Sequence, residues 1–202
     1  YYQSGIVTYE DIKSTKEMGN HIRSLQIHHG LSDLGTYVDK KGIGKFLDTL
    51  SFPLYFLDFE TMQLAIPQFV GTRPYAQIPF QYSLHYLENE GGELKHKEFL
   101  AESGTDPRRA LAEQLCADIP MGVCVTAYNK AFECPRLKEL AELYPDLADH
   151  LLNIEANIVD LLVPFQSGYY YNAGLQAGTD LPFHFQRDSI PLLYIQNASN
   201  SA

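Results

Sequence analysis

The sequence has few of the features on which several protein classes depend. It holds 15 lysines and arginines against 25 aspartates and glutamates, a formal net charge of −10. This balance argues against a stand-alone nucleic-acid-binding protein, because phosphate affinity comes largely from basic side chains. The three cysteines, Cys116, Cys124 and Cys134, show no C-x-x-C spacing, so we interpret them as reduced structural thiols of a cytoplasmic protein. No apolar run approaches the roughly 20 residues of a membrane span, and we expect no membrane as partner.

The remaining composition is that of one globular unit. Hydrophobic residues make up 45% of the 202 positions, enough for one good core but not for two full domains. The chain begins at Tyr1 instead of Met, and we expect it to be part of a longer protein. Apolar spacing predicts a short helical lead-in over residues 1–45, followed by the main domain over 46–171. We interpret His28 and His29, which lie on different faces of a helix, as surface residues.

The most informative stretch is an apolar strand that ends in two acids. Residues 54–57 are apolar and run directly into Asp58 and Glu60, whose side chains leave a strand on the same face. Two like charges this close repel each other and lose hydration unless a cation or a shared proton compensates. Carboxylates suit Mg²⁺ or Mn²⁺, and two such ions about 4 Å apart are a standard device for phosphodiester hydrolysis. The alternative is that Asp58 bonds loop amides at a strand end and Glu60 begins a solvated turn.

The rest of the domain predicts an α/β fold in which three antiparallel strands precede an α-β-α-β succession. Residues 80–86 alternate between apolar and polar types, as a half-buried strand does, and Asn89-Glu-Gly-Gly92 is a turn into a returning strand. Asp106-Pro107 is typical of a helix start. This order is that of a ribonuclease H-like mixed sheet flanked by helices, with the Asp58 strand at its centre. The later elements are predicted as a helix to residue 118, a strand at 121–127, a helix at 136–152 interrupted at Pro145, and a strand at 157–162.

A second acidic motif follows the fourth predicted strand, where the chain reads Tyr128-Asn-Lys-Ala-Phe-Glu133. Together with the D-x-E of the first strand, this N-x-x-F-E string resembles the DnaQ-like, DEDD-type 3'-5' exonucleases, whose second motif is N-x-x-F-D. Asp160 matches the acid-bearing strand that follows this motif. The resemblance implies two Mg²⁺ or Mn²⁺ ions held by catalytic Asp58, Glu60 and Glu133, acting on a single-stranded DNA or RNA end. The alternative for Glu133 is an exposed acid favoured by the helix dipole.

A narrower resemblance covers residues 36–171. It is to an uncharacterised bacterial domain family that often lies C-terminal to a RecB-like nuclease region, and it implies such a region as a partner in the same full-length protein. As substrate contacts we predict Thr61, Arg73, Tyr75 and Asn129, against the alternative that these side chains pack and shape turns. The strings that carry the resemblance are residues 54–60, 66–67, 71–75, 77–83 and 128–133.

The third motif of the exonucleases has no clear counterpart. That motif needs an Asp on a final helix with a His or Tyr shortly before it. His184 and Asp188 are four residues apart, but Pro182 and Pro191 bracket them in a stretch of poor helix character, so we rank them as weak candidates together with Asp160. We expect residues 172–202 to be an atypical tail, disordered or altered by a change of reading frame. Two function classes therefore stay open: a metal-dependent exonuclease-like phosphodiesterase, weak or inactive in this chain, and a catalytically reduced scaffold that binds nucleic acid or an adjoining nuclease domain.

Overall fold

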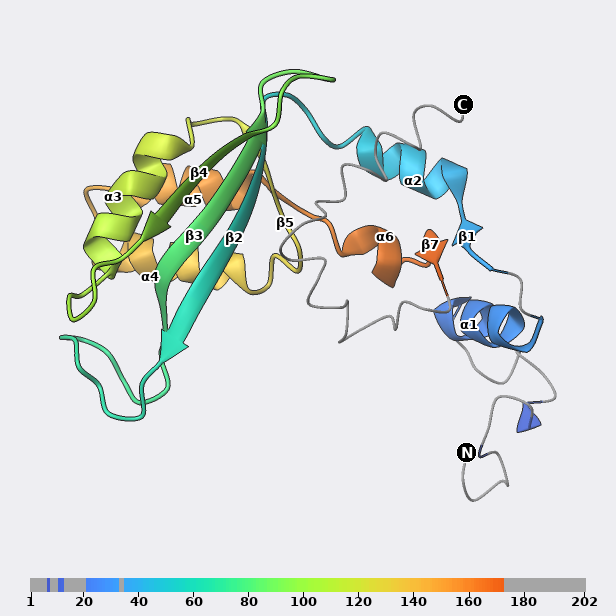
Figure 1. The fold of residues 1–202 in the computed structure, drawn as a ribbon, viewed down its shortest axis with the longest axis horizontal. Helices are drawn as coiled ribbons and strands as arrows, with labels where there is room; N and C mark the ends of the chain where they lie inside the picture. Colours follow the sequence, from blue (N-terminus) through green and yellow to red (C-terminus); the bar gives the residue numbers. More distant parts are fainter. Residues whose placement is uncertain (1–6, 8–10, 13–20, 33–34, 173–202) are drawn as a thin grey trace. The chain divides into compact units, whose positions relative to one another are not determined.

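A computed structural model describes residue 7 and residues 11–12, 21–32 and 35–172. The chain divides into two compact units, one formed by residues 48–161 and the other by residues 1–47 together with 162–202. Both acidic motifs lie in the unit of residues 48–161. Figure 1 shows the fold, coloured from the N-terminus to the C-terminus.

The unit of residues 48–161 is built on a five-stranded mixed sheet with strand order β4-β3-β2-β5-β6. The first three strands are antiparallel neighbours, and β5 and β6 run parallel to the central strand β2. The expected α/β class with a mixed sheet is therefore confirmed, and the strand with Asp58 lies at the sheet centre. The strands are β2 (Leu54–Gln63), β3 (Gln77–Leu87), β4 (Lys95–Leu100), β5 (Cys124–Ala127) and β6 (Ile158–Asp160).

The register of β2 against β3 changes beside the acids. Asp58 pairs with Ser83 and Glu60 with Gln81, but the next residue, Thr61, pairs with Pro79. One residue of β3 is therefore left over, which is a β-bulge. Proline cannot donate a ladder hydrogen bond, so within sheets it is confined to edges and bulges. The bulge therefore explains why Pro79 is tolerated in β3. Bulges bend a strand and increase its twist, and this one lies directly after Glu60.

Three helices cover one face of this sheet, as Figure 1 shows. They are α3 (Arg108–Asp118), α4 (Glu133–Leu143) and α5 (Ala148–Ala156). The helical stretch expected over 136–152 is interrupted around Pro145, as predicted, and consists of α4 and α5, although α4 begins three residues earlier, at Glu133. At the start of α3 the cap position is Pro107, one residue after the predicted Asp106, but Asp106 Oδ1 still accepts the main-chain N–H of Arg108 at 3.2 Å.

The core lies between the helices and the covered face of the sheet. Side chains that alternate with Asp58 along β2, such as Leu57 and Phe59, are buried there together with Tyr82 and Leu84 of β3. Burying one such side chain stabilises the fold by about 1.5–3 kcal/mol. Because the pleat sends successive residues to opposite faces, packing of this set places Asp58 and Glu60 on the other face. Cys116, Cys124 and Cys134 are free thiols, as expected.

The other unit contains α1 (His21–Ser32), β1 (Tyr37–Val38), α2 (Lys40–Leu47), α6 (Val163–Gln166) and β7 (Tyr170–Tyr171). Strands β1 and β7 pair in antiparallel fashion, with Tyr37 opposite Tyr171 and Val38 opposite Tyr170. The interpretation of His29 as a surface residue is wrong. Its side chain is only 7% exposed, because the rings of Tyr37 and Tyr171 lie edge-on against it and its Nδ1 lies 3.2 Å from the carbonyl oxygen of Gly35. No helix in the described part of the chain is long and apolar enough to cross a membrane.

Candidate carboxylate site

The two acids of the first motif lie within β2, just past the level at which the neighbouring parallel strands β5 and β6 finish. Asp58 and Glu60 stand on the same side of β2 and are both exposed. Strand β5 ends at Ala127, which pairs with Asp160 at the end of β6. In open α/β sheets, ligands bind outside the carboxyl ends of the strands. The end of the sheet that carries the predicted acids is therefore the usual place for a site.

The turn after β5 is held by the last residue of β6. The main-chain N–H of Asn129 donates a hydrogen bond to Asp160 Oδ1 at 3.0 Å, and Asn129 has φ = +64°, a left-handed conformation that Asn adopts more readily than most residues. Its carbonyl oxygen accepts the N–H of Phe132 at 2.9 Å. These bonds turn the chain into α4, whose first residue is Glu133. Asn129 shapes this turn, as one of the alternatives held, and its predicted contact with substrate stays a prediction.

Glu133 is a buried acid. It is 2% exposed, so the alternative of an exposed acid at a helix start is wrong. Its Oε2 is buried and has no hydrogen-bond partner among the described residues. Burial raises the pKa of the Glu133 carboxyl to about 8, and the charges of Asp58 and Asp160 act in the same direction, against the opposing effects of its own N–H and of Arg136. The carboxyl group therefore holds its proton at neutral pH.

Asp58 belongs to the same electrostatic system. Although the residue keeps an exposed surface, the surrounding protein partly desolvates its carboxyl group, and this desolvation, followed by the charge of Glu60, raises the pKa of Asp58 to about 6. The charges of Asp58 and Asp160 thus act on Glu133, and the charge of Glu60 acts on Asp58, so four acids from β2, α4 and β6 are linked electrostatically. We call Asp58, Glu60, Glu133 and Asp160 the carboxylate cluster. The sequence ranked Asp160 as a weak candidate, whereas the structure couples it to Glu133.

The chemistry of these donors is that of a site for a hard cation. Carboxylate oxygens are the ligands that Mg²⁺ and Mn²⁺ prefer, and the buried Oε2 of Glu133 is a polar atom that lacks the partner which burial normally demands. Within the described ranges, however, no group of three or more His, Cys, Asp or Glu side chains is arranged to hold one metal ion. The donor set fits a divalent cation by its chemistry, and the convergence of its members on one ion stays a prediction.

The structure separates the predicted substrate contacts into two places. Thr61 is half-buried in β2 at the bulge, beside the carboxylate cluster. Arg73 and Tyr75 lie in the connection between β2 and β3 and line a cavity of ≈ 520 Å³, which sequence reasoning did not anticipate. His184 and Asp188 lie outside the described residues. Arg136 joins the two places, because it lines the cavity and also acts on the Glu133 carboxyl, one helical turn away.

Two histidines on the cluster face of the sheet were not singled out from the sequence. His85 and His96 are cross-strand partners in β3 and β4, with ring centroids 4.3 Å apart, and His96 Nε2 lies 3.2 Å from the hydroxyl oxygen of Ser83. Burial and then the neighbouring His96 lower the pKa of His85. Ser83 is the cross-strand partner of Asp58, so the pair stands on the same face as the acids. The alternation along β3 places Ser83 and His85 on the same face as the acids. This pattern could have identified His85 from the sequence.

Comparison with known proteins places most of this unit in one family. A family model described as Domain of unknown function (DUF2779) matches residues 55–179, more than half of the chain. The match begins within β2 and includes both acidic motifs. No curated protein and no solved structure matches the chain.

Proposed function

This chain belongs to the family described as Domain of unknown function (DUF2779), and we propose that its domain is a divalent-metal-dependent phosphodiesterase of the 3'-5' exonuclease type, with a ribonuclease H-like fold. The observation that carries the proposal is the coupling of Glu133 to Asp58 and Asp160 at the carboxyl ends of parallel strands. Mutually repelling acids in that place are costly to the fold unless they serve a cation.

The residues that would hold the cations are the members of the carboxylate cluster. When bound, divalent ions supply positive charge that stabilises the attacking and leaving oxygens of an in-line displacement at phosphorus. Asp58, with Glu60 beside it on β2, would bind cations from the exposed side, and Glu133 would bind from the buried side after releasing its proton. Asp160 is already oriented by the Asn129 N–H, which fixes one of its oxygens. The choice of phosphodiester substrate rests on the D-x-E and N-x-x-F-E motifs.

Cation linkage is the direct test of this proposal. We expect Mn²⁺ and Mg²⁺ to raise the melting temperature of the parent chain, because a ligand at 100 times its Kd stabilises the fold by about 2.7 kcal/mol. Asp58→Asn and Glu133→Gln should lose most of this shift. In EDTA, Asp58→Asn should melt above the parent, since the variant removes a repelled charge. Glu113→Gln, an exposed acid on α3 outside the cluster, is the matched control and should keep the metal shift. Equal shifts in all four proteins would exclude the carboxylate cluster as the cation site.

A catalytically reduced scaffold is the second candidate, and one finding favours it. The described residues contain no group of three His, Cys, Asp or Glu side chains placed around a common ion, as expected of a scaffold that does not cleave. End-labelled single-stranded DNA and RNA, incubated in Mn²⁺, separate the two candidates. Shortening from the 3' end that is lost in Asp58→Asn identifies the phosphodiesterase. Retention of the oligonucleotide without shortening identifies the scaffold.

A further inference from the structure

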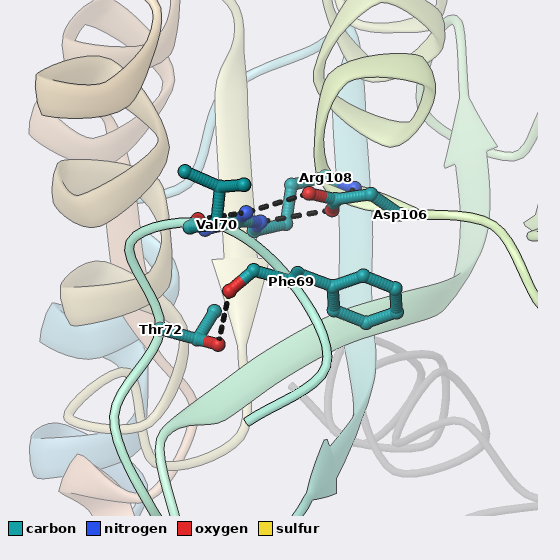
Figure 2. Close-up of polar contacts among 5 residues, drawn as sticks. All are labelled: Phe69, Val70, Thr72, Asp106 and Arg108. Carbon is teal, nitrogen blue, oxygen red and sulfur yellow. Dashed lines mark hydrogen bonds and ion pairs between the residues drawn. The ribbon is translucent and has the colours of Figure 1, made fainter.

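The connection between β2 and β3 is a closed loop with its own internal bonds. The N–H of Tyr75 donates to the carbonyl oxygen of Leu64 at 2.9 Å and closes the base. Inside it, Phe69 O accepts both the N–H of Thr72 at 3.2 Å and the Thr72 hydroxyl at 2.7 Å, the second of which Figure 2 shows. Compact loops of this length with adjoining ends are frequently functional. We call residues 64–75 the β2–β3 loop.

Arg108, at the start of α3, anchors the β2–β3 loop to the helical layer. Its Nη2 donates to the carbonyl oxygen of Val70 at 2.8 Å, while the same guanidinium is held by Asp106 through bonds of 2.9 and 2.6 Å (Figure 2). The Arg108 side chain is only 12% exposed, whereas Val70, whose carbonyl oxygen it holds, is 93% exposed. A loop fixed in this way pays little ordering entropy when a ligand binds.

The cavity beside the β2–β3 loop has the size of a ligand site. Its volume is ≈ 520 Å³, within the roughly 300–1,000 Å³ of small-molecule sites. Ile78 of β3 and Leu140 and Leu143 of α4 supply apolar surface, and charged groups stand around them. A mixed apolar and charged lining suits a ligand with a flat apolar part and an ionised part.

Tyr75 presents an aromatic ring to this cavity from a strained backbone. It has φ = +59°, a conformation that costs a bulky residue about 1–3 kcal/mol. Burial of the side chain does not offset this strain, because the residue remains 66% exposed. Strain that persists in an exposed aromatic residue at a cavity is typical of ligand contacts.

Among the three arginines that line the cavity, Arg73 is the one whose guanidinium has no partner in the described part of the chain. The guanidinium of Arg136 is engaged by Glu139 and by Gln77, and that of Arg108 by Asp106 and the loop. Arg73 is exposed, and although its carbonyl oxygen accepts the N–H of Ala76 at 3.1 Å, its guanidinium forms no hydrogen bond or ion pair with any residue that the structure describes. Its position in a cavity, with all its donors available, suits an anion. Glu142 also lines the cavity and would oppose that anion.

From these contacts we infer that the cavity binds one nucleotide unit of a single-stranded nucleic acid, with Tyr75 stacked on the base and Arg73 on the adjoining phosphate. The choice of nucleic acid as ligand rests on the proposed function. A stacked base on an exposed aromatic ring, with a basic side chain along the backbone, is the usual mode of sequence-independent single-strand binding. Arg136 places this cavity beside Glu133, so a strand held here lies next to the carboxylate cluster.

The test measures the binding of short labelled oligothymidylate and oligouridylate to the full chain. Binding is monitored by fluorescence anisotropy, in EDTA and at low salt. Tyr75→Asn, which removes the ring but accepts a left-handed backbone, should weaken binding roughly 5- to 100-fold, and Tyr75→Phe should bind as the parent does. Arg73→Gln should lower the slope of log Kd against log salt by about 0.7, the value for one phosphate contact on a single strand. Glu142→Gln should strengthen binding, because it removes the opposing charge.

The control is Arg109→Gln, an exposed arginine on α3 that pairs with Glu113 and Asp146 outside the cavity, and its salt slope should equal that of the parent. Parent-like affinity and slope in Tyr75→Asn and Arg73→Gln would overturn the inference. Equal competition by thymidine monophosphate, or equal affinity for a duplex, would overturn its assignment to a single strand. Because binding is measured in EDTA, it is separate from the proposed hydrolysis. If binding depends on Tyr75 but metal does not raise the melting temperature, only the phosphodiesterase proposal is rejected. If metal raises the melting temperature but binding does not depend on Tyr75, only the present inference is rejected.

Discussion

Asn129 and Asp160 are joined by a hydrogen bond of 3.0 Å from a main-chain N–H to a carboxylate oxygen. Asn129 follows β5, Asp160 is the last residue of the adjacent parallel strand β6, and the two are 31 positions apart in the sequence. One bond therefore fixes the turn that leads to Glu133 and also orients an acid of the carboxylate cluster. Substitutions that disturb this turn should therefore lower the free energy of unfolding.

At position 129 the backbone conformation decides which residues are tolerated. With φ = +64°, we expect Asn129→Ala to destabilise the chain by roughly 1–2 kcal/mol, the cost of a left-handed conformation for an L-residue, and Asn129→Gly to cost less. Urea unfolding of the three proteins measures the difference. Equal midpoints for the alanine and glycine variants would show that the conformation carries no strain.

The buried acid predicts a dependence of stability on pH. The folded pKa of Glu133 is about 8, above the value of about 4.3 in an unfolded chain, so the folded state binds this proton more tightly. Stability without metal should therefore be highest below about pH 4.3 for this group and fall as the pH rises towards 8. Glu133→Gln should change stability little at pH 4 to 5 and stabilise the chain by a few kcal/mol near pH 9.

Urea unfolding in EDTA across this pH range measures that effect. Glu113→Gln, whose carboxylate is exposed, should differ from the parent by the same small amount at every pH. A Glu133→Gln variant that differs from the parent equally at pH 5 and pH 9 would mean that this carboxyl does not hold its proton in the folded state.

A buried pair in the core allows a prediction independent of function. The Tyr82 hydroxyl donates to Asp118 Oδ2 at 2.6 Å, and Lys97 Nζ donates to the other carboxylate oxygen at 3.0 Å. Tyr82→Phe leaves the carboxylate short of a partner and should cost about 1–3 kcal/mol at pH 7.

The same pair predicts how that cost changes in acid. Burial raises the pKa of Asp118, but hydrogen bonds from Tyr82, Lys97 and Gln114, with the charge of Lys97, outweigh it and hold the pKa below its usual range. The stabilisation is therefore present above the unfolded pKa of about 3.9 and is lost as the pH falls through the folded value. Urea unfolding at pH 7 and pH 3 should show the larger Tyr82→Phe effect at pH 7, and a larger effect at pH 3 would contradict the bonding.

As a nuclease, this chain should be weak. The exonuclease resemblance requires a third acid and a base on a final helix, and the sequence after residue 172 does not display that pattern. Losing one member of a catalytic unit costs orders of magnitude in rate, and the net charge of −10 adds poor capture of a polyanion. Incubation with labelled single strands in Mn²⁺ should give slow degradation at most. Robust degradation from one end that vanishes in Asp58→Ala would contradict this expectation and direct attention to His184 and Asp188.

Much of the sheet could be predicted from the sequence because its signals are local. The alternation of apolar and polar residues in β2 and β3 reflects the period of a strand, and the turn at residues 89–92 leads into β4 as expected. The same period placed Asp58 and Glu60 on one face before any tertiary contact was known. The motif after β5 likewise located the turn at Asn129.

The tertiary structure alone decided how these residues interact. Whether Glu133 is a solvated acid or a buried one depends on which elements pack around the start of α4, and its coupling to Asp160 spans two strands. The cavity depends on Arg108 reaching Val70, 38 residues earlier in the chain. His29 is buried because Tyr171, from the other end of the described chain, lies against it. A pattern of a few residues predicts the type of the local element and the face on which each side chain lies. Burial and pKa, by contrast, are set by neighbours that only the folded chain brings together.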